Sequence, residues 1–340
     1  MKKLLLLFTA CAVSAAMLAG CGKSGVKNSA EATPENPMVL TLAHNLSETH
    51  ITSIALQDFA DLVEEESNGR IKIQIYPGGQ LGSETEVLEQ LMAGVVGMTR
   101  VSAPGLATYN EGYHTFGLPY IFKDTQNYYD VMDSDAMGGF FRSSEKDGFV
   151  TLTYYTSGSR SFYTINKPIR KPEDLKGLKI RVQDMKSQTD MIKALGGTPV
   201  AMAMGDVFTS LQTGIIDGTE NNETALTTGK HGEICKYYSV DQHSMIPDVL
   251  VISSVIWKQL TPEDQNILIN AAKKSTESHK AAWEAGIEKA VAEAKDTMGV
   301  TFVEDVDKDA FRAATKEMIQ SYSEKYPKVQ DVLNIINSVD

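Results

Sequence analysis

Two segments decide the fold class of this chain: KGLKIRV at residues 176–182 and LQTGIIDGTENN at residues 211–222. In each segment a glycine precedes an apolar run, and polar side chains lie on or directly after that run. Stretches of helical character separate the two runs, and a strand–helix–strand order is typical of an open α/β sheet. Because such sheets bind ligands at the loops beyond their strand ends, the pattern predicts that Arg181, Asn221 and Asn222 lie at a binding site.

Two arginines lie near strand ends in this region. Arg160 precedes an extended segment, Ser161 to Thr164, and Arg181 lies within the run from Leu178 to Val182. An arginine in a partly closed cleft can hold a carboxylate through two parallel N–H···O bonds, each contributing roughly 1.5 to 3 kcal/mol. Asparagine adds a donor and an acceptor that suit hydroxyl groups. The residues therefore predict a site for a small carboxylate, and an ion pair between Arg181 and a structural aspartate or glutamate is an equal alternative.

The chain is long enough for two lobes. About 300 residues follow the N-terminal region, which is more than one hydrophobic core usually organises. Strand-like runs alternate with helical stretches and lie at residues 39–44, 71–76, 98–102, 150–155, 178–182 and 249–253. Residues 90–97 and 210–217 echo each other, because both contain a helix end, a glycine that stops the helix, and a strand start. We therefore predict an α/β protein with two lobes, each of which contains one copy of this helix–glycine–strand pattern.

A long helix is predicted to begin after Thr261, since threonine is a favoured N-cap and Pro262 fits the first helical turn. If it continues towards Gly299, it reaches on the order of 50 Å at about 1.5 Å per residue. That length suffices for a spine along both lobes. The predicted boundaries are 37–158 with 247–286 for lobe I, and 159–246 with 287–340 for lobe II.

The N-terminus is predicted to be a secretion signal. Lys2 and Lys3 precede an apolar run at residues 4–19 that is short for a membrane span and ends in small residues. The sequence LAGC at 18–21 resembles a bacterial lipobox. We therefore expect residues 1–20 to be removed and Cys21 to be lipidated, so that residues 21–36 form a flexible tether at the membrane. Cleavage without lipidation is the alternative.

Charge and cysteine content narrow the classes of partner. The formal net charge of the chain is -12, and it becomes -14 when Lys2 and Lys3 leave with the signal. An acidic chain without a basic stripe is not expected to bind nucleic acid. Cys11 lies in the signal segment and Cys21 is the expected lipid site, so Cys235 has no partner for a disulfide.

A set of short motifs resembles one family over residues 39–261. In chain order they are GRIKI (69–73), YP (76–77), QLG (80–82), FGLPY (116–120), DLKGLKIRV (174–182), LQTG (211–214) and DGTEN (217–221). As a set they are similar to the solute-binding proteins of tripartite ATP-independent periplasmic (TRAP) transporters, the C4-dicarboxylate-binding or DctP-like family. The resemblance implies a two-lobe α/β fold with a hinge, a ligand cleft between the lobes and a long spine helix.

The same resemblance implies transport rather than catalysis. An extracytoplasmic protein of this family captures a small organic acid and delivers it to a membrane permease driven by an ion gradient, without a cofactor. Arg181 matches the family's carboxylate-clamping arginine, Arg160 its second arginine, and Asn221 its asparagine. Glu84 and Asn45 fall at positions that often touch ligand. Glu84 also suits the first turn of a helix, where the helix dipole favours an acid, so a purely structural role stays open.

Departures from the family's commonest motif point to the ligand. The asparagine is doubled, Asn221 then Asn222, and His50, His243 and Asp248 are further hydrogen-bonding side chains. They offer more hydroxyl partners than a small dicarboxylate uses, and they resemble the branch that binds sugar acids. We therefore expect a hexuronate such as glucuronate or galacturonate. A C4-dicarboxylate or another hydroxy or keto acid is the alternative, in which case Asn222 only caps the next helix.

Other chemistry has little support in the sequence. The chain contains no HExxH or GxSxG motif and no phosphate-binding glycine loop. His44 and His50 lack further ligands at metal-binding spacing, so no metal site is expected. A lipoprotein enzyme acting on uronate polymers and a ligand-binding sensor lipoprotein are the rival classes. Arg100 lies in an otherwise apolar strand and is either a third cation in the cleft or an inter-lobe salt bridge.

Overall fold

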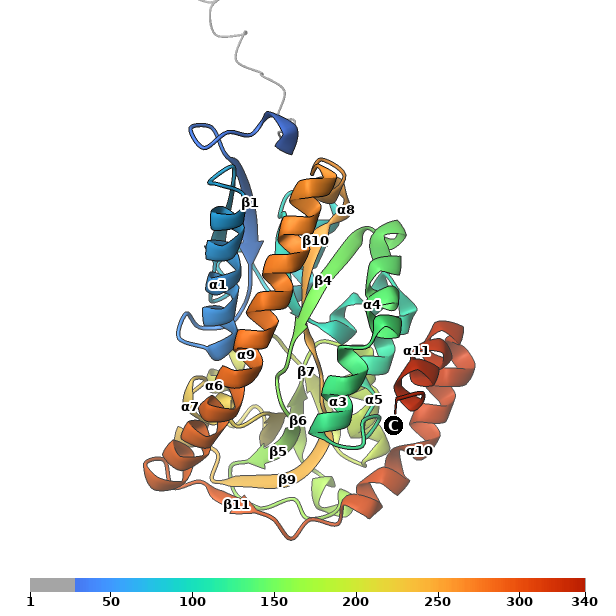
Figure 1. Ribbon diagram of the computed structural model, residues 1–340. Helices are drawn as coiled ribbons and strands as arrows, with labels where there is room; N and C mark the ends of the chain where they lie inside the picture. Colours follow the sequence, from blue (N-terminus) through green and yellow to red (C-terminus); the bar gives the residue numbers. More distant parts are fainter. Residues whose placement is uncertain (1–27, 340) are drawn as a thin grey trace, which may run out of the picture.

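The computed structural model describes residues 28–339 and consists of two α/β lobes that share a long helix (Figure 1). The predicted signal peptide and Cys21 lie outside the described residues. Lobe I is built on a five-stranded sheet, in the spatial order β2 (Ile71–Tyr76), β1 (Met38–Ala43), β3 (Met98–Ser102), β10 (Asp248–Ser253) and β4 (Phe149–Tyr155). Lobe II is built on a six-stranded sheet, in the order β11 (Thr301–Val303), β9 (Tyr237–Ser244), β5 (Arg160–Thr164), β8 (Gly218–Asn221), β6 (Lys179–Val182) and β7 (Thr198–Ala201).

The two sheets share one topology. In lobe I, β1 pairs in parallel with β2 and β3, and in lobe II, β6 pairs in parallel with β7 and β8. A strand that has crossed from the other lobe comes next in each sheet, β10 beside β3 and β5 beside β8, and both pair antiparallel. The segments that lead into β3 and β8, residues 90–97 and 210–217, occupy equivalent places, which confirms the internal echo in the sequence.

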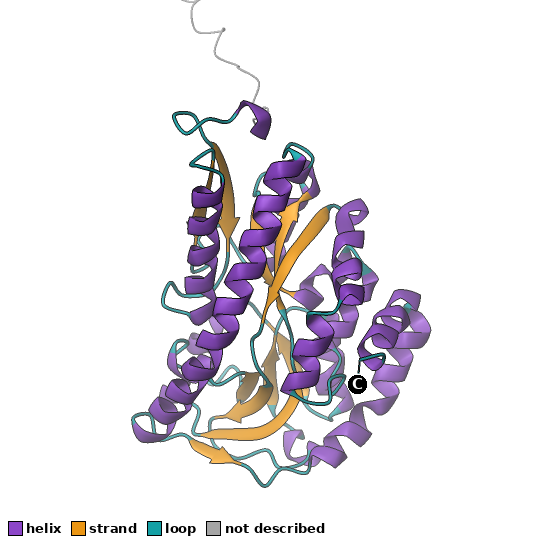
Figure 2. Cartoon of the chain, viewed as in Figure 1, coloured by secondary structure: helices purple, strands orange, loops and turns teal. Residues whose placement is uncertain are grey.

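Helices cover the outer faces of both sheets (Figure 2). The α-helices are α1 (Ile51–Glu66), α2 (Glu84–Met92), α3 (Thr125–Met132), α4 (Asp135–Arg142), α5 (Lys186–Ala194), α6 (Val207–Gln212), α7 (Thr224–Thr227), α8 (Ser254–Trp257), α9 (Pro262–Asp296), α10 (Lys308–Lys325) and α11 (Pro327–Asn337). Short 3-10 segments are η1 (Ser29–Glu31), η2 (Ala103–Thr108), η3 (Glu111–Gly117), η4 (Ser143–Asp147), η5 (Pro172–Leu175), η6 (Met204–Asp206) and η7 (His231–Glu233).

The long helix α9 is the predicted spine. Its 35 residues correspond to roughly 50 Å, and Figure 1 shows it running along both lobes. The Thr261 hydroxyl accepts a hydrogen bond from the Asp264 backbone N–H and caps the helix. Leu268 belongs to the lobe I core, whereas Ala294 packs in the core of lobe II. Gly286 allows α9 to approach α1 closely, because a Cβ atom at this position would overlap the Cδ1 atom of Ile51.

The six predicted strands are all present, and their ends differ by no more than one residue from the prediction. Two other expectations are wrong. Residues 28–36 are not wholly a free tether, because Ser29 is buried and its backbone N–H donates to the Gln259 carbonyl. Helix α11 does not belong to lobe II alone, since Val332 and Ile336 pack into the lobe I core. Both errors concern contacts between segments far apart in the sequence.

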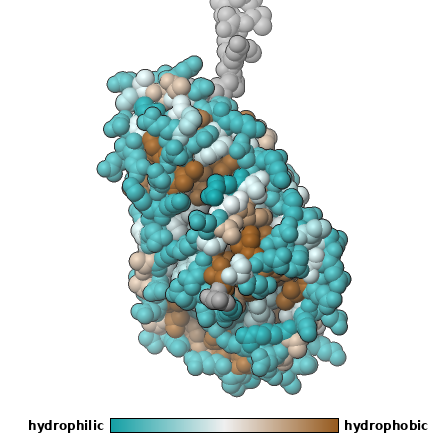
Figure 3. Space-filling view, turned by 45° about the vertical axis from the view of Figure 1, so that its right-hand side comes forward, coloured by the Kyte–Doolittle hydropathy of each residue, from teal (hydrophilic) through white to brown (hydrophobic). Residues whose placement is uncertain are grey.

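The surface is mostly hydrophilic, and hydrophobic side chains show in recesses on the face seen in Figure 3. None of the helices in the described part of the chain is long and apolar enough to cross a membrane. Cys235 is a free, buried cysteine.

Candidate functional site: the cleft between the lobes

A cavity of about 1060 Å³ lies between the lobes. Residues at the carboxyl ends of the parallel strands in both sheets line this cavity, as is expected of open α/β sheets. The lining includes eight of the nine residues expected to bind ligand: Asn45, His50, Glu84, Arg160, Arg181, Asn221, Asn222 and Asp248. Arg100, Ser102 and Gln183 line it as well. The ninth predicted residue, His243, is not among the lining residues.

Arg181 is a buried cation without an ion-pair partner among the described residues. Its side chain is on β6, it is 3% exposed, and its Nε and Nη2 atoms donate to the Met202 carbonyl at 3.0 and 2.8 Å. Burial lowers the pKa of the guanidinium, although Glu220 partly offsets the effect. The structural ion pair considered for Arg181 is therefore absent, and its positive charge faces the cavity uncompensated by a direct carboxylate.

Arg160 differs from Arg181 because it is paired. Its Nε and Nη2 atoms donate to the two carboxylate oxygens of Glu220 at 2.6 and 2.9 Å, and Nη1 donates to Asn221 Oδ1 at 2.7 Å. Burial disfavours the charge of Arg160, but Glu220 outweighs burial and raises its pKa above the ordinary value. Arg160 thus contributes an oriented donor set, and it holds Asn221 in place at the cleft.

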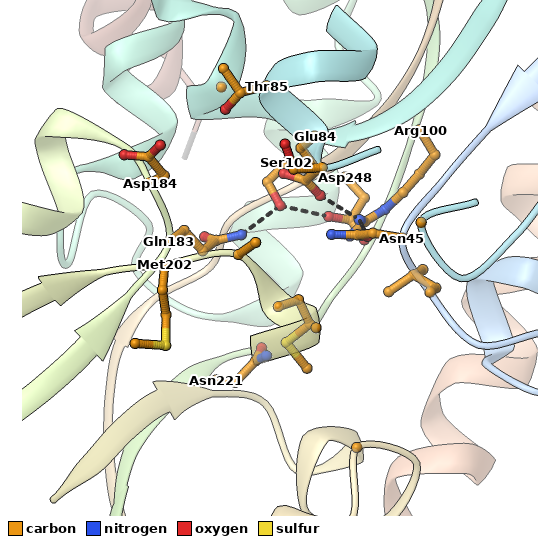
Figure 4. A pocket seen from close by; sticks show the side chains of 18 of the residues that line it. Asn45, Glu84, Thr85, Arg100, Ser102, Gln183, Asp184, Met202, Asn221 and Asp248 are labelled. Atoms are coloured by element: carbon orange, nitrogen blue, oxygen red, sulfur yellow. Dashed lines mark hydrogen bonds and ion pairs between the residues drawn. The ribbon is translucent and has the colours of Figure 1, made fainter. Parts of the chain in front are cut away.

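The opposite wall is a charged cluster within lobe I (Figure 4). Arg100 Nη1 donates to Glu84 Oε1 at 2.9 Å and to Asn45 Oδ1 at 3.1 Å, and its Nη2 forms an ion pair with Asp248. Burial raises the pKa of the Glu84 carboxyl, while Arg100 opposes the shift. Arg100 is therefore a third cation in the cleft, and its salt bridges lie within one lobe rather than between lobes.

One hydrogen bond crosses the cleft beside this cluster. Gln183 Nε2, from lobe II, donates to Ser102 Oγ at 2.8 Å, and Ser102 Oγ donates to Asp248 Oδ1 at 3.4 Å. The sequence analysis did not predict that Ser102 and Gln183 line the cavity. Their positions at strand ends could have indicated it, because Ser102 is the last residue of β3 and Gln183 directly follows β6.

Asn222 and His50 both have structural partners as well as a place in the lining. Asn222 Oδ1 accepts from the Thr224 backbone N–H at 3.0 Å, which is the helix-start role considered for it. His50 Nδ1 accepts from the Thr52 N–H at 3.1 Å, and its Nε2 lies 3.3 Å from Thr224 Oγ1 in the other lobe. Burial lowers the pKa of His50 to about 3, so it contributes no positive charge.

His243 lies behind Arg160 rather than on the cavity wall. Its Nδ1 is 2.7 Å from Asp241 Oδ2, and its Nε2 is 3.4 Å from Glu220 Oε2. The prediction that His243 touches ligand is not supported, because both ring nitrogens face buried carboxylates. In residues 28–339, no three or more His, Cys, Asp or Glu side chains lie close enough together to hold a metal ion.

A cavity between two lobes of shared topology, lined by a buried guanidinium with no ion-pair partner in residues 28–339, is the architecture of a two-lobe solute-binding protein. Residues 42–325 match the family described as bacterial extracellular solute-binding protein, family 7 (DctP), and the chain belongs to that family. It is similar to the uncharacterized protein YiiZ of Salmonella typhimurium, with 41% identity over 287 residues, covering 82% of this chain and 88% of that protein.

Solved structures agree with this assignment. A TRAP periplasmic solute-binding protein from Anaerococcus prevotii with bound D-glucuronate has 35% identity and a TM-score of 0.85, covering 88% of this chain and 97% of that one. A TRAP periplasmic protein from Xanthobacter autotrophicus with bound β-D-galacturonate has 34% identity and a TM-score of 0.85, covering 88% and 100%. The chain is therefore an extracytoplasmic TRAP solute-binding protein for small organic acids, a transport component and not an enzyme.

Proposed function

We propose that this protein captures a hexuronate, D-glucuronate or D-galacturonate, in the interlobe cleft and delivers it to a TRAP-type membrane permease. The observation that carries the proposal is Arg181, which is buried at the cavity and has no ion-pair partner in the part of the chain that the structure describes. A bound carboxylate supplies the missing counter-charge in bidentate geometry. The two neighbours at 34% and 35% identity have a hexuronate bound, which supports this ligand class.

The charges around the cleft favour an acid with one carboxylate. Arg100 faces two carboxylates, Glu84 and Asp248, and Arg160 faces Glu220. Only Arg181 among these three arginines lacks an ion-pair partner, so the site has room for one anionic group. A second carboxylate directed at lobe I would meet Glu84 and Asp248, and like charges at short distance are strongly disfavoured in a partly buried site.

The remaining lining suits hydroxyl groups. Asn45, Ser102 and Gln183 supply neutral donors and acceptors, while the carboxylates of Glu84 and Asp248 accept hydrogen bonds. A site built to bond hydroxyls rejects an analogue that lacks them, because its buried polar groups are then left unpaired. A C4-dicarboxylate, the alternative ligand, has too few hydroxyl groups to form hydrogen bonds with most of these lining side chains.

Ligand capture is proposed to proceed by hinge closure. The chain crosses between the lobes at residues 156–159 and again at 245–247, and the two crossings lie side by side, since the Ser157 hydroxyl donates to the Ile246 carbonyl. A uronate that contacts Arg181 in lobe II and the Arg100 cluster in lobe I binds the closed form more tightly than the open form. That difference in affinity shifts the population towards closure.

Lipidation of Cys21 is part of the proposal, since it would hold the protein at the outer face of the membrane beside its permease. Cys21→Ser is expected to release the protein from the membrane fraction in cells. Incorporation of a labelled fatty acid should be lost in the same variant. Retention of label in Cys21→Ser would show that the lipid is attached elsewhere.

The ligand assignment is tested by a thermal-shift screen of residues 22–340 followed by calorimetric titration of every hit. The panel holds hexuronates, aldonates, C4-dicarboxylates, keto acids and neutral sugars. A ligand at about one hundred times its Kd adds roughly 2.7 kcal/mol of stability, which corresponds to several degrees in Tm. A shift with hexuronates alone supports the proposal. A shift with dicarboxylates alone would refute the charge argument, and no shift with any acid would refute the hexuronate assignment.

A further inference from the structure

His231 is a histidine of lobe II that lines the cavity and that the sequence analysis did not predict. It is the first residue of η7, and only 1% of its surface is exposed. The residue before it, Lys230, has a φ of 59°, which is uncommon for a residue other than glycine. Buried polar side chains are nearly always hydrogen-bonded, so the partners of the two ring nitrogens decide what His231 does.

The first ring nitrogen is bonded within the protein. His231 Nδ1 lies 2.7 Å from the Tyr163 hydroxyl, and the two rings are stacked with their centroids 5.8 Å apart. Tyr163 is on β5 and is itself buried, so it is a fixed point of the lobe II core. The bond that one ring nitrogen makes sets the orientation of the imidazole and the role left for the other nitrogen.

The second ring nitrogen, Nε2, has no hydrogen-bond partner among residues 28–339. Gly229 also lines the cavity, and a Cβ atom on Gly229 would lie 3.3 Å from Nε2. The glycine therefore leaves this side of the ring uncovered, although a Cβ atom would also meet the Ala225 carbonyl oxygen at 2.6 Å. An unpaired buried nitrogen is unfavourable, so Nε2 is suited to a hydrogen bond with a molecule in the cavity.

His231 is a neutral hydrogen-bonding group at physiological pH. Burial lowers the pKa of its imidazole to about 4, and the charge of Arg181 adds to the effect. The two side chains are therefore neighbours on the wall that lobe II contributes to the cavity. A neutral imidazole has one donor and one acceptor nitrogen, so Nε2 takes the role that Nδ1 leaves. A ligand hydroxyl group suits Nε2 in either role, whereas a carboxylate suits it only as a donor.

We propose that His231 Nε2 binds a ligand hydroxyl group next to the carboxylate held by Arg181, and that in a hexuronate this is the hydroxyl group on C4. The inference rests on the proposed function, because it takes the contact between Arg181 and the carboxylate as given. In the ring form of a hexuronate the carboxylate is attached to C5, so the C4 hydroxyl is the nearest one to it. D-Glucuronate and D-galacturonate differ only in the configuration at C4. His231 therefore determines which of the two epimers binds more tightly.

The size of this preference follows from one hydrogen bond. The epimer whose C4 hydroxyl reaches Nε2 forms the bond, and the other epimer leaves the nitrogen unpaired in a buried position. A site built to bond a hydroxyl group discriminates against a ligand that does not place one there. We expect the wild type to bind the two epimers with Kd values that differ about tenfold.

The experiment is a calorimetric titration of D-glucuronate and of D-galacturonate into wild type, His231→Asn and His114→Asn. An asparagine side chain reaches as far as Nδ1 but not as far as Nε2, so His231→Asn keeps a partner for the Tyr163 hydroxyl and loses the ligand contact. His114 is the matched control, since it packs against Tyr322 and Tyr326 and is not among the cavity-lining residues. We expect His231→Asn to bind the preferred epimer about tenfold more weakly and to bring the two Kd values within about twofold. His114→Asn should keep the wild-type ratio.

The outcomes separate this inference from the ligand assignment. If His231→Asn keeps the wild-type ratio of Kd values, the role of His231 is refuted and the hexuronate assignment stands. The same holds if the wild type binds both epimers equally. A wild type that binds neither hexuronate would refute the proposed function and this inference together.

A second variant, Tyr163→Phe, tests the same contact without changing His231. It keeps the aromatic ring and removes the hydroxyl that orients the imidazole. The ratio of Kd values for the two epimers should become smaller in Tyr163→Phe. If the bond between Tyr163 and His231 only supports the fold, Tyr163→Phe will lower the free energy of unfolding by urea without changing that ratio, and this result would overturn the proposal.

Discussion

Replacing Arg181 with alanine should abolish ligand binding while leaving the fold largely intact. A bidentate carboxylate contact comprises two charge-assisted hydrogen bonds worth roughly 1.5 to 3 kcal/mol each, so their loss weakens binding by about 3 to 6 kcal/mol, or on the order of a hundredfold to ten-thousandfold. Stability should change little, because Arg181 has no ion-pair partner between residues 28 and 339 to leave behind. The Met202 carbonyl loses its two donors, but it lies at the cavity, where water can replace them.

Arg160→Ala is the contrasting variant. Removing Arg160 leaves Glu220 without its strongest partner, and breaking a buried ion pair on one side costs about 3 to 5 kcal/mol. The free energy of unfolding by urea, measured without ligand, should therefore fall sharply for Arg160→Ala and hardly at all for Arg181→Ala. Equal losses of stability in both variants would refute the distinction between a paired and an unpaired arginine.

Arg181→Lys tests the geometry of the contact separately from its charge. A lysine keeps the positive charge but replaces the planar fork with a point charge, so about one of the two hydrogen bonds is lost. We expect a Kd between ten and roughly 150 times larger, measured by calorimetric titration with the hexuronate that the screen identifies. Affinity equal to that of the wild type would mean that the ligand carboxylate does not sit on Arg181.

Three further substitutions address specificity, cleft closure and the spine helix. Glu84→Gln removes one of the two acids beside Arg100, so the affinity for a sugar dicarboxylate relative to its uronate should rise, and an unchanged ratio in competition titrations would contradict the charge argument. Gln183→Ala removes the bond to Ser102 across the cleft and should weaken uronate binding about threefold to tenfold with little change in unfolding free energy. Gly286→Ala should lower the free energy of unfolding by about 1 to 3 kcal/mol relative to a Gly→Ala change in an open part of a helix, through overlap with Ile51. The control for this last variant is Gly139→Ala on α4, where a Cβ meets nothing within 4 Å, so a loss of stability there as large as at Gly286 would refute the packing explanation.

Most of the architecture could be predicted from local patterns. Apolar alternation and glycine stops located the six strands, and Thr261 with Pro262 located the start of the spine helix. Each of these signals acts within a few residues, since backbone hydrogen bonds and helix caps are satisfied locally. The sequence alone also shows that the ends of α2 and α6 are equivalent, because the same pattern of a helix stopped by glycine precedes β3 and β8.

Tertiary structure decided which charges are paired. Arg160 and Arg181 look alike in the sequence, yet a partner 60 residues away neutralises Arg160, and no described residue forms an ion pair with Arg181. Arg100 forms an ion pair with Asp248, which lies on β10, a strand far from Arg100 in the sequence that pairs with β3. Charge pairing depends on distance in space and on burial, and neither quantity has a signature at short range in the sequence.

The same reason accounts for what the sequence alone misplaced. His243 carries the right chemistry for a ligand contact, but a bulge in β9 turns it towards Glu220 and Asp241 instead of the cavity. Residues 28–36 lack apolar periodicity, and α11 was assigned to lobe II with the rest of the C-terminal segment, yet each is fixed by contacts across the chain. The sequence by itself determined the elements, their order and the chemistry available at the strand ends. The fold decided which of those side chains face the ligand, because that choice is made by packing between distant segments.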